Sequence, residues 1–215
     1  MMDTVYDRSN LAEYQFTVDW LANDVPAWNL LLEQTGPKRI AEIGSFEGRS
    51  ACHIIERCCT NGPIDLVCID SWQGGDGLAV DAMGDVERRF DHNVSIAISR
   101  SQSLARVRKF KSYSNVALIE LIHEHGRGTF DLIYIDGSHQ APDVLVDAVL
   151  AFQLLRVGGL MIFDDYLWSL EAQGQEDSLN MAKPAIDAFL NIFQRKMTLI
   201  RRLPLYQLYA TKIAD

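Results

Sequence analysis

The stretch from Phe130 to Tyr166 restricts the possible folds of this chain more than any other part of its sequence. It opens with a short apolar run, Phe130–Ile135, rich in aromatic and β-branched residues, which is typical of a strand buried on both faces of a parallel sheet. Apolar residues at helical spacing follow over 141–155. The pair Gly158-Gly159 then ends this unit, and Leu160–Phe163 is a second buried run. This order predicts two neighbouring parallel strands joined by a crossover helix.

Acidic residues stand directly after both predicted strands. Asp136 follows the first strand, and Asp164 and Asp165 follow the second. Because parallel neighbours lie about 4.8 Å apart and open their carboxyl ends on the same side, we expect these side chains to converge. Carboxylates this close repel one another unless a cation or a proton is present, and their hard oxygens favour magnesium or a similar divalent ion over zinc. Taken alone, each aspartate is equally consistent with a helix cap or a turn.

A histidine lies in the loop that follows the first of these strands. His139 comes three residues after Asp136, at the same predicted edge of the sheet. A neutral imidazole can take up a proton near neutral pH, so His139 is a candidate general base. Together with the three aspartates, it favours a functional site over a set of unrelated turns.

The first strand, predicted over 38–43, leads into a glycine-containing turn before a helix. Such a turn brings backbone N–H groups and the positive end of the helix toward a ligand, as nucleotide-binding turns do. A dinucleotide fingerprint requires Gly-x-Gly-x-x-Gly, but counted from Gly44 the second and third positions hold Phe46 and Arg49. This argues against NAD or FAD.

Two further strand ends are predicted at the same edge. Asp70 follows Ile64–Ile69 and is suited to accept hydrogen bonds from ribose hydroxyls, although a capping role remains open. Ser112 and Ser114 follow a third strand over 106–111 and could flank a base or cap a helix. The remaining predicted elements are helices over 85–101, 115–124 and 182–193, a flexible loop over 73–77, a loop over 166–177, and a closing strand pair over 196–202 and 205–211.

Length and composition predict one α/β domain. The chain has 215 residues, of which 48% are hydrophobic, and no linker composition divides it. Residues 38–215 are interpreted as this domain. Residues 1–37 are interpreted as a helical extension of it, with one or two helices between Leu11 and Gln34 interrupted by Pro26. The apolar faces of that extension are compatible with a homo-oligomer.

The charge and the apolar runs exclude several classes of partner. A net charge of −9 without a long basic run argues against nucleic-acid binding. No apolar run reaches the roughly 20 residues that span a bilayer, and the start of the chain lacks the pattern of a signal peptide, so we expect no membrane association and a cytoplasmic location. The four cysteines have no metal-ligand spacing and are expected to be reduced thiols in the core.

These motifs together resemble the class I S-adenosylmethionine-dependent methyltransferases, over about residues 38–212. The motifs are Glu42-x-Gly44-x3-Gly48, Asp70, Asp136 and Gly158-Gly159. Within that superfamily, Ile135-Asp136-Gly137-Ser138-His139 and Phe163-Asp164-Asp165-Tyr166 are similar to the methyltransferase-24 group, which contains macrocin-type and cephalosporin-pathway O-methyltransferases. The resemblance implies a Rossmann-like, mostly parallel seven-stranded sheet with helices on both faces and an antiparallel last strand.

The resemblance also implies roles for individual residues. The cofactor S-adenosylmethionine would be held by Glu42, Gly44, Ser45, Gly48, Asp70, Ser71, Trp72, Ser114 and Asp136. Among these, Asp70 would bind the ribose, while Ser71, Trp72 and Ser114 would lie near the adenine. The metal-binding carboxylates would be Asp136, Asp164 and Asp165, with Asp164 open to an indirect, water-mediated role.

The leading functional hypothesis is methyl transfer to a hydroxyl group of a small molecule, assisted by magnesium or a similar ion and by His139 as general base. The closest alternative is a metal-independent methyltransferase. A magnesium-dependent phosphate-ester hydrolase would also use clustered carboxylates, but the chain lacks a nucleophile motif of the Asp-x-Asp type and a Walker-type loop. A cofactor-binding protein without catalysis is a third alternative.

Overall fold

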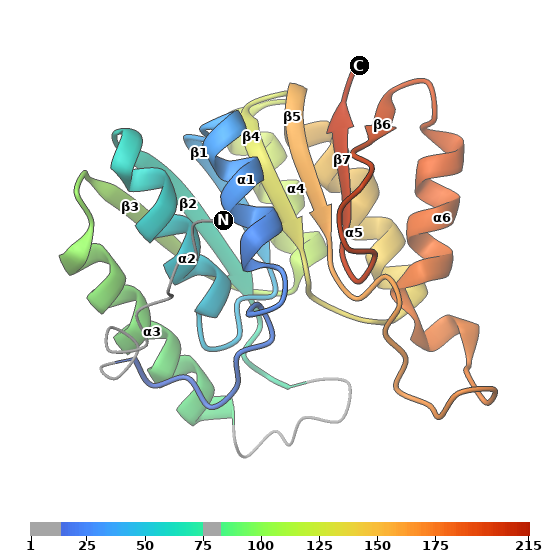
Figure 1. Ribbon diagram of the computed structural model, residues 1–215, viewed down its shortest axis with the longest axis horizontal. Coiled ribbons are helices and arrows are strands. Elements are labelled where there is room, and N and C mark those ends of the chain that lie inside the picture. The colour runs from blue at the N-terminus through green and yellow to red at the C-terminus, as the bar shows by residue number, and fades with distance from the viewer. Residues whose placement is uncertain (1–13, 75–82) are drawn as a thin grey trace, which may run out of the picture.

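A seven-stranded sheet forms the centre of the computed structural model, which describes residues 14–74 and 83–215 (Figure 1). Its strand order is β3-β2-β1-β4-β5-β7-β6. The strands are β1 (Arg39–Ile43), β2 (Ile64–Asp70), β3 (Ala105–Lys111), β4 (Phe130–Ile135), β5 (Leu155–Phe163), β6 (Met197–Leu199) and β7 (Leu208–Lys212). The helices are α1 (Val25–Thr35), α2 (Arg49–Cys58), α3 (Met83–Arg100), α4 (Ser114–His125), α5 (Ala141–Leu154) and α6 (Ala182–Ile192), with short 3-10 turns at Cys59–Asn61 and Ser178–Asn180.

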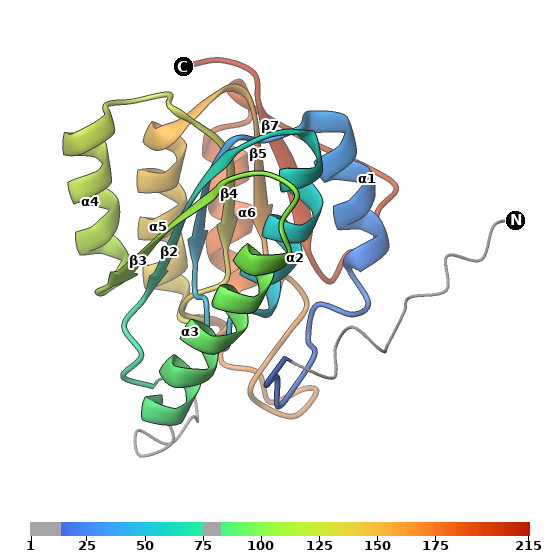
Figure 2. The same cartoon turned by 90° about the vertical axis from the view of Figure 1, so that its left-hand side faces the viewer.

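Helices cover both faces of the sheet. Viewed along the sheet, α1, α2 and α3 lie on one side, and α4, α5 and α6 lie on the other (Figure 2). Each face has its own apolar core, one containing Trp28, Ile54 and Phe90 and the other containing Leu118 and Phe152. Strands buried on both faces must be apolar along most of their length, which is why the sequence shows continuous apolar runs instead of alternation.

The predicted fold class is confirmed. Strands β1 to β5 pair in parallel, and β7 pairs antiparallel to both β5 and β6. The chain passes outward from β1 through β2 to β3, and then crosses back so that β4 lies on the other side of β1. Ligands of open α/β sheets bind outside the carboxyl ends of the strands at such a reversal. The topology therefore predicts a ligand site at the ends of β1 and β4.

Strand β5 begins earlier than its apolar run indicates. It starts at Leu155, directly after α5, and its pairing with β4 shifts between Phe130–Leu155 and Leu132–Leu160. The two glycines expected before the strand therefore lie inside an irregular stretch of it. An ion pair between Arg156 Nε and Asp131 Oδ1 at 2.6 Å joins this stretch to β4, an interaction that a hydrophobicity pattern does not contain.

The N-terminal extension contains a single described helix. It forms only from Val25, because Pro26 suits the first turn of a helix, where its missing N–H leaves no hydrogen bond unmade. Residues 14–24, which we call the strap, run as bends and turns, and residues 11–13 of the predicted helix lie outside the described residues. Glu47 holds the strap, because its carboxylate accepts hydrogen bonds from Thr17 N at 2.6 Å and Thr17 Oγ1 at 2.7 Å.

Several smaller expectations can be compared with the structure. All four cysteines are free and buried, as predicted. The loop predicted over 73–77 lies outside the described residues from residue 75 onward. Within the described ranges, every helix is too short or too polar to cross a membrane. The cytoplasmic location, the domain division at residue 37 and a homo-oligomer stay predictions.

Gly44 is required by the close approach of two strand ends. Its φ is +85°, and a Cβ added there would lie 1.8 Å from the carbonyl oxygen of Asp136. We therefore expect Gly44→Ala to lower the free energy of unfolding by more than about 3 kcal/mol, measured by urea denaturation. Gly36→Ala is the matched control, since Gly36 also has a positive φ but nothing lies within 4 Å of the added atom; it should cost only about 1 kcal/mol. Equal losses in the two variants would contradict the steric argument.

Candidate functional site

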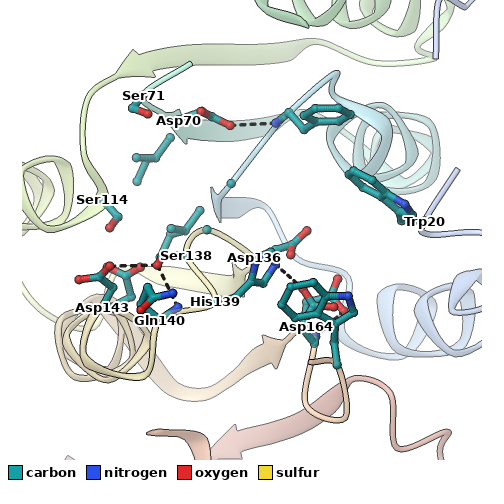
Figure 3. A pocket seen from close by; sticks show the side chains of 18 of the residues that line it. Trp20, Asp70, Ser71, Ser114, Asp136, Ser138, His139, Gln140, Asp143 and Asp164 are labelled. Atoms are coloured by element: carbon teal, nitrogen blue, oxygen red, sulfur yellow. Dashed lines mark hydrogen bonds and ion pairs between the residues drawn. The ribbon is translucent and has the colours of Figure 1, made fainter. Parts of the chain in front are cut away.

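A cleft of about 1260 Å³ opens at the carboxyl ends of β1, β2, β4 and β5. Asp70 and Ser71 lie on one side of it, and Ser138, His139 and Gln140 lie across from them (Figure 3). The strap reaches the cleft as well, through Trp20, whose ring centroid lies 5.0 Å from that of Phe46 with the two rings tilted by 33°. The cleft therefore lies at the strand reversal that the topology singles out.

Asp70 organises the turn between β1 and α2. Its Oδ2 accepts hydrogen bonds from Ser45 N at 3.0 Å and Phe46 N at 2.9 Å, and its Oδ1 accepts one from Trp72 N at 2.7 Å. Phe46 and Trp72 both have a positive φ, so these bonds hold a backbone conformation that side-chain-bearing residues rarely adopt. A carboxylate offers about four acceptor positions, so Asp70 can hold the turn and still accept a bond from a ligand in the cleft.

Glu42 supports the same turn from below. It is fully buried on β1 and accepts hydrogen bonds from Ser45 Oγ at 2.7 Å and from the hydroxyl of Ser50 on α2. Burial raises the pKa of Glu42 to about 7, although the two hydroxyl groups partly offset that rise. Glu42 therefore ties the first strand to the first helix of the sheet.

The predicted cofactor residues fall into two layers. Those that line the cleft are Gly44, Asp70, Ser71, Ser114 and Asp136. Glu42, Ser45, Gly48 and Trp72 lie behind its wall. The ring of Trp72 is buried 4.9 Å from that of Phe90 on α3, and a Cβ on Gly48 would meet the Phe90 ring at 3.0 Å. The roles predicted for all nine residues stay predictions, but the second layer would act by shaping the turn.

An acidic group with a histidine forms the mouth of the cleft. One ligand atom each from Asp136, His139 and Asp165 lie within 4.8 Å of one another. His139 Nε2 is 2.7 Å from Asp165 Oδ2, and the Trp168 ring packs 4.3 Å from the imidazole. The structure thus brings together the ends of β4 and β5, as expected from their parallel pairing. The carboxylate oxygens of this group are hard donors that fit a divalent cation.

Asp164 points into a different network from Asp165. The hydroxyl of Tyr134 lies between Asp164 Oδ2 and Asp136 Oδ2, 2.8 Å from the latter. Gln207 Nε2 donates to Asp164 Oδ2 at 3.0 Å. The orientation of Gln207 is determined by Trp28 Nε1, which donates to Gln207 Oε1 at 2.7 Å. Asp164 therefore stands outside the closest donor group, in line with the indirect role left open for it.

Burial and charge repulsion at the mouth raise the pKa of two half-buried aspartates. Burial, followed by repulsion from Asp164 and Asp165, raises the pKa of Asp136 well above its usual range. Burial and repulsion from Asp165 raise the pKa of Asp164 to about 6. A cation bound among these groups would offset the repulsion, which is the electrostatic signature expected of a cation site.

A family model described as a methyltransferase domain, the methyltransferase-24 family, matches residues 41–166. That match covers more than half of the chain and contains the Gly44 turn, Asp136, His139 and Asp165. The chain belongs to this methyltransferase family. It is an S-adenosylmethionine-dependent methyltransferase of class I, as the motifs predicted. A search of curated proteins found no match.

Solved structures with low sequence identity share the fold of this methyltransferase. An O-methyltransferase from Bacillus cereus in complex with SAH is 17% identical, with a TM-score of 0.58 over 95% of this chain and 86% of that chain. TomG from Streptomyces achromogenes, an O-methyltransferase of tomaymycin synthesis in complex with SAM, is 16% identical, with a TM-score of 0.58 over 89% and 80%. The SAH-bound methyltransferase PaMTH1 from Podospora anserina is 16% identical, with a TM-score of 0.58 over 89% and 78%.

The structure adds residues to the site of this methyltransferase that the motifs did not indicate. Tyr134 precedes Asp136 by two positions and so shares its face of β4, a relation that the sequence did contain. Gln207, Trp20 and Trp168 had no such signal, because Gln207 lies in the C-terminal segment before β7 and the two tryptophans lie in irregular segments. Their places depend on contacts between distant parts of the chain.

The raised pKa of Glu42 should make the free energy of unfolding depend on pH. Its ordinary value is 4.5 and its folded value is about 7, so between these the folded protein holds a proton that the unfolded chain has lost. The contribution of Glu42 to stability therefore falls as pH rises through this window. We expect Glu42→Gln to gain stability relative to wild type by up to about 3 kcal/mol across that range, measured by urea denaturation. A difference between the two proteins that stays constant with pH would be the contrary result.

Proposed function

We propose that this methyltransferase transfers the methyl group of S-adenosylmethionine to a hydroxyl oxygen of a small molecule, with a divalent cation held by Asp136 and Asp165. The observation that carries the proposal is the group formed by Asp136, His139 and Asp165, which opens on the same cleft as the Gly44 turn. Cofactor and acceptor would thus meet at one mouth.

The choice of an oxygen acceptor is supported by chemistry and by likeness. Bacillus cereus O-methyltransferase and TomG share the fold, and both are described as acting on oxygen. A divalent cation supplies Lewis acidity, which lowers the pKa of a hydroxyl group bound to it. Hard oxygen donors such as Asp136 and Asp165 suit magnesium, which favours oxygen ligands.

His139 would act as the general base of the reaction. It lies at the mouth of the cleft, where it can take the proton of the acceptor hydroxyl, and the neighbouring Asp165 carboxylate would stabilise the imidazolium that forms. Packing against Trp168 limits the orientations of the ring. Once the oxygen has lost its proton, the step that remains is alignment of that oxygen with the methyl carbon, so positioning by the cleft supplies most of the catalysis.

The three alternative functions are supported to different degrees. Family membership leaves the phosphate-ester hydrolase and the non-catalytic binding protein without a supporting observation. A metal-independent methyltransferase shares the same cofactor cleft, so the response to a chelator separates it from the proposal. The acceptor would be a small hydroxylated molecule that fits between the strap and the loop after β5.

Binding of the cofactor product is the first expected result. Calorimetric titration with S-adenosylhomocysteine should show saturable binding, with and without magnesium, because the cofactor cleft is formed by the protein alone. A parallel titration with NAD should show none, because the Gly44 turn lacks the second and third glycines that bring a pyrophosphate close to the backbone. Binding of NAD in place of S-adenosylhomocysteine would contradict the assignment of the cofactor.

Two substitutions separate the cation from the base. Asp165→Asn should weaken magnesium binding by at least about tenfold, because it removes a charged ligand, while Asn tolerates the positive φ of this position.

His139→Ala should abolish turnover but leave magnesium and cofactor affinities within about threefold, measured by calorimetry. His123→Ala, which removes an exposed imidazole on α4, is the control. Loss of magnesium binding in His139→Ala would make His139 a ligand instead of the base.

A further inference from the structure

The wall of the cleft carries acidic side chains without a basic counterpart. Eight of the residues that line it are aspartates, and none is a lysine or an arginine, among residues 14–74 and 83–215. Arg49 comes closest to this wall in sequence and contact, since its Nε lies 2.9 Å from Asp19 Oδ1, but that ion pair already balances its charge. A negatively charged group of a ligand would therefore meet acids in this wall and no cationic side chain to pair with.

The acids at the mouth exceed what one divalent cation balances. Asp136 and Asp165 would hold the cation, which leaves Asp164 and Asp24 in the same wall. Asp24, at the start of α1, is close enough to sense the other acids. Burial raises the pKa of Asp24; a hydrogen bond with Tyr209 partly offsets this rise, and the charge of Asp165 adds to it. The sulfonium of the cofactor adds one positive charge, so the mouth still keeps an excess of negative charge when these acids are ionised.

A large aromatic ring stands exposed at the same mouth. Trp20 lines the cleft from the strap, yet 66% of it is exposed, and its ring rests at a tilt beside that of Phe46. In Figure 3, Trp20 and His139 appear on opposite sides of Asp136. A ring left open inside a cleft gains most of its contacts when a ligand covers it. The face of a tryptophan ring attracts a cation more strongly than that of any other side chain.

We propose that the methyl acceptor is a hydroxylated amine, whose protonated amino group lies against the ring of Trp20 while its hydroxyl faces His139. This proposal rests on the proposed function and names the acceptor class of that site. The excess of negative charge and the aromatic face both favour an ammonium group. An acceptor with a carboxylate or a phosphate would be repelled by the same acids, so the cleft selects by charge as well as by the presence of a hydroxyl.

The test compares three probes that differ at one end. Dopamine, 4-ethylcatechol and dihydrocaffeate share a catechol ring and end in an ammonium, an uncharged ethyl group and a carboxylate. Each is titrated by calorimetry into wild type saturated with S-adenosylhomocysteine and magnesium, at about pH 8, where an alkylamine keeps its proton. Dopamine should bind at least about tenfold more tightly than dihydrocaffeate, with 4-ethylcatechol between them. Dihydrocaffeate binding as tightly as dopamine would overturn the proposal.

Substitutions of Trp20 test the role of its ring. Trp20→Leu should reduce the preference for dopamine over 4-ethylcatechol by about threefold, whereas Trp20→Phe should keep most of it, because phenylalanine retains an aromatic face. Both variants should fold, since the side chain is largely exposed. Tyr113→Leu is the matched control, because it removes another exposed ring that lines the cleft, next to Ser114 at the start of α4. A preference unchanged in Trp20→Leu would contradict the role of this ring.

The same titrations separate this proposal from the proposed function. If none of the three probes binds to a protein that does bind S-adenosylhomocysteine and magnesium, the acceptor class is wrong and the proposed function stands. If S-adenosylhomocysteine or magnesium itself fails to bind, the proposed function is contradicted, and the acceptor class is overturned with it.

Discussion

The close approach of the ends of β1 and β4 determines how the Gly44 turn and the acidic mouth lie relative to each other. Gly44 passes so near the backbone of Asp136 that no side chain fits between the two. This approach follows from the parallel pairing of β1 with β4, whose last pair joins Ile43 and Ile135. It brings the cofactor turn and the first residue of the acidic mouth to opposite sides of one contact. The distance between the proposed cofactor position and the proposed cation position would thus be determined by backbone packing, and close-packed interiors have low compressibility.

Behind the acidic mouth, hydrogen bonds from buried side chains offset part of the repulsion between the aspartates. Tyr134 bridges Asp136 and Asp164, and Gln207, held by Trp28 on α1, donates to Asp164. The helix before β1 and the segment before β7 therefore meet beneath the site, although 179 residues separate Trp28 from Gln207. This support leaves Asp165, with a positive φ, turned toward His139. Both aspartates line the cleft, but Asp164 bonds to the side chains beneath it and Asp165 pairs with His139.

Sequence reasoning was successful where the controlling interactions are local or periodic. The apolar run Phe130–Ile135 coincides with β4, because a strand buried on both faces needs such a run at every position. Convergence of Asp136 and Asp165 followed from two strand ends and one crossover helix. The beginning of β5 was misjudged because the ion pair of Arg156 with Asp131 lies outside any hydrophobic pattern. The strap was predicted to be helical, since its apolar residues have helical spacing, but its backbone bonds to Glu47 and Asn93 instead.

Strand periodicity and short motifs encode the fold class, the family and the edge of the sheet that carries the cleft, because each of these depends on residues close together in the chain. Which carboxylates face one another depended on how the whole chain folds. The tertiary structure separated Asp164, which bonds to Tyr134, from Asp165, which pairs with His139, although the two are adjacent in the chain. The physical reason is that burial and hydrogen-bond partners depend on side chains contributed by remote segments. Those same partners determine the pKa of each acid, and hence its role.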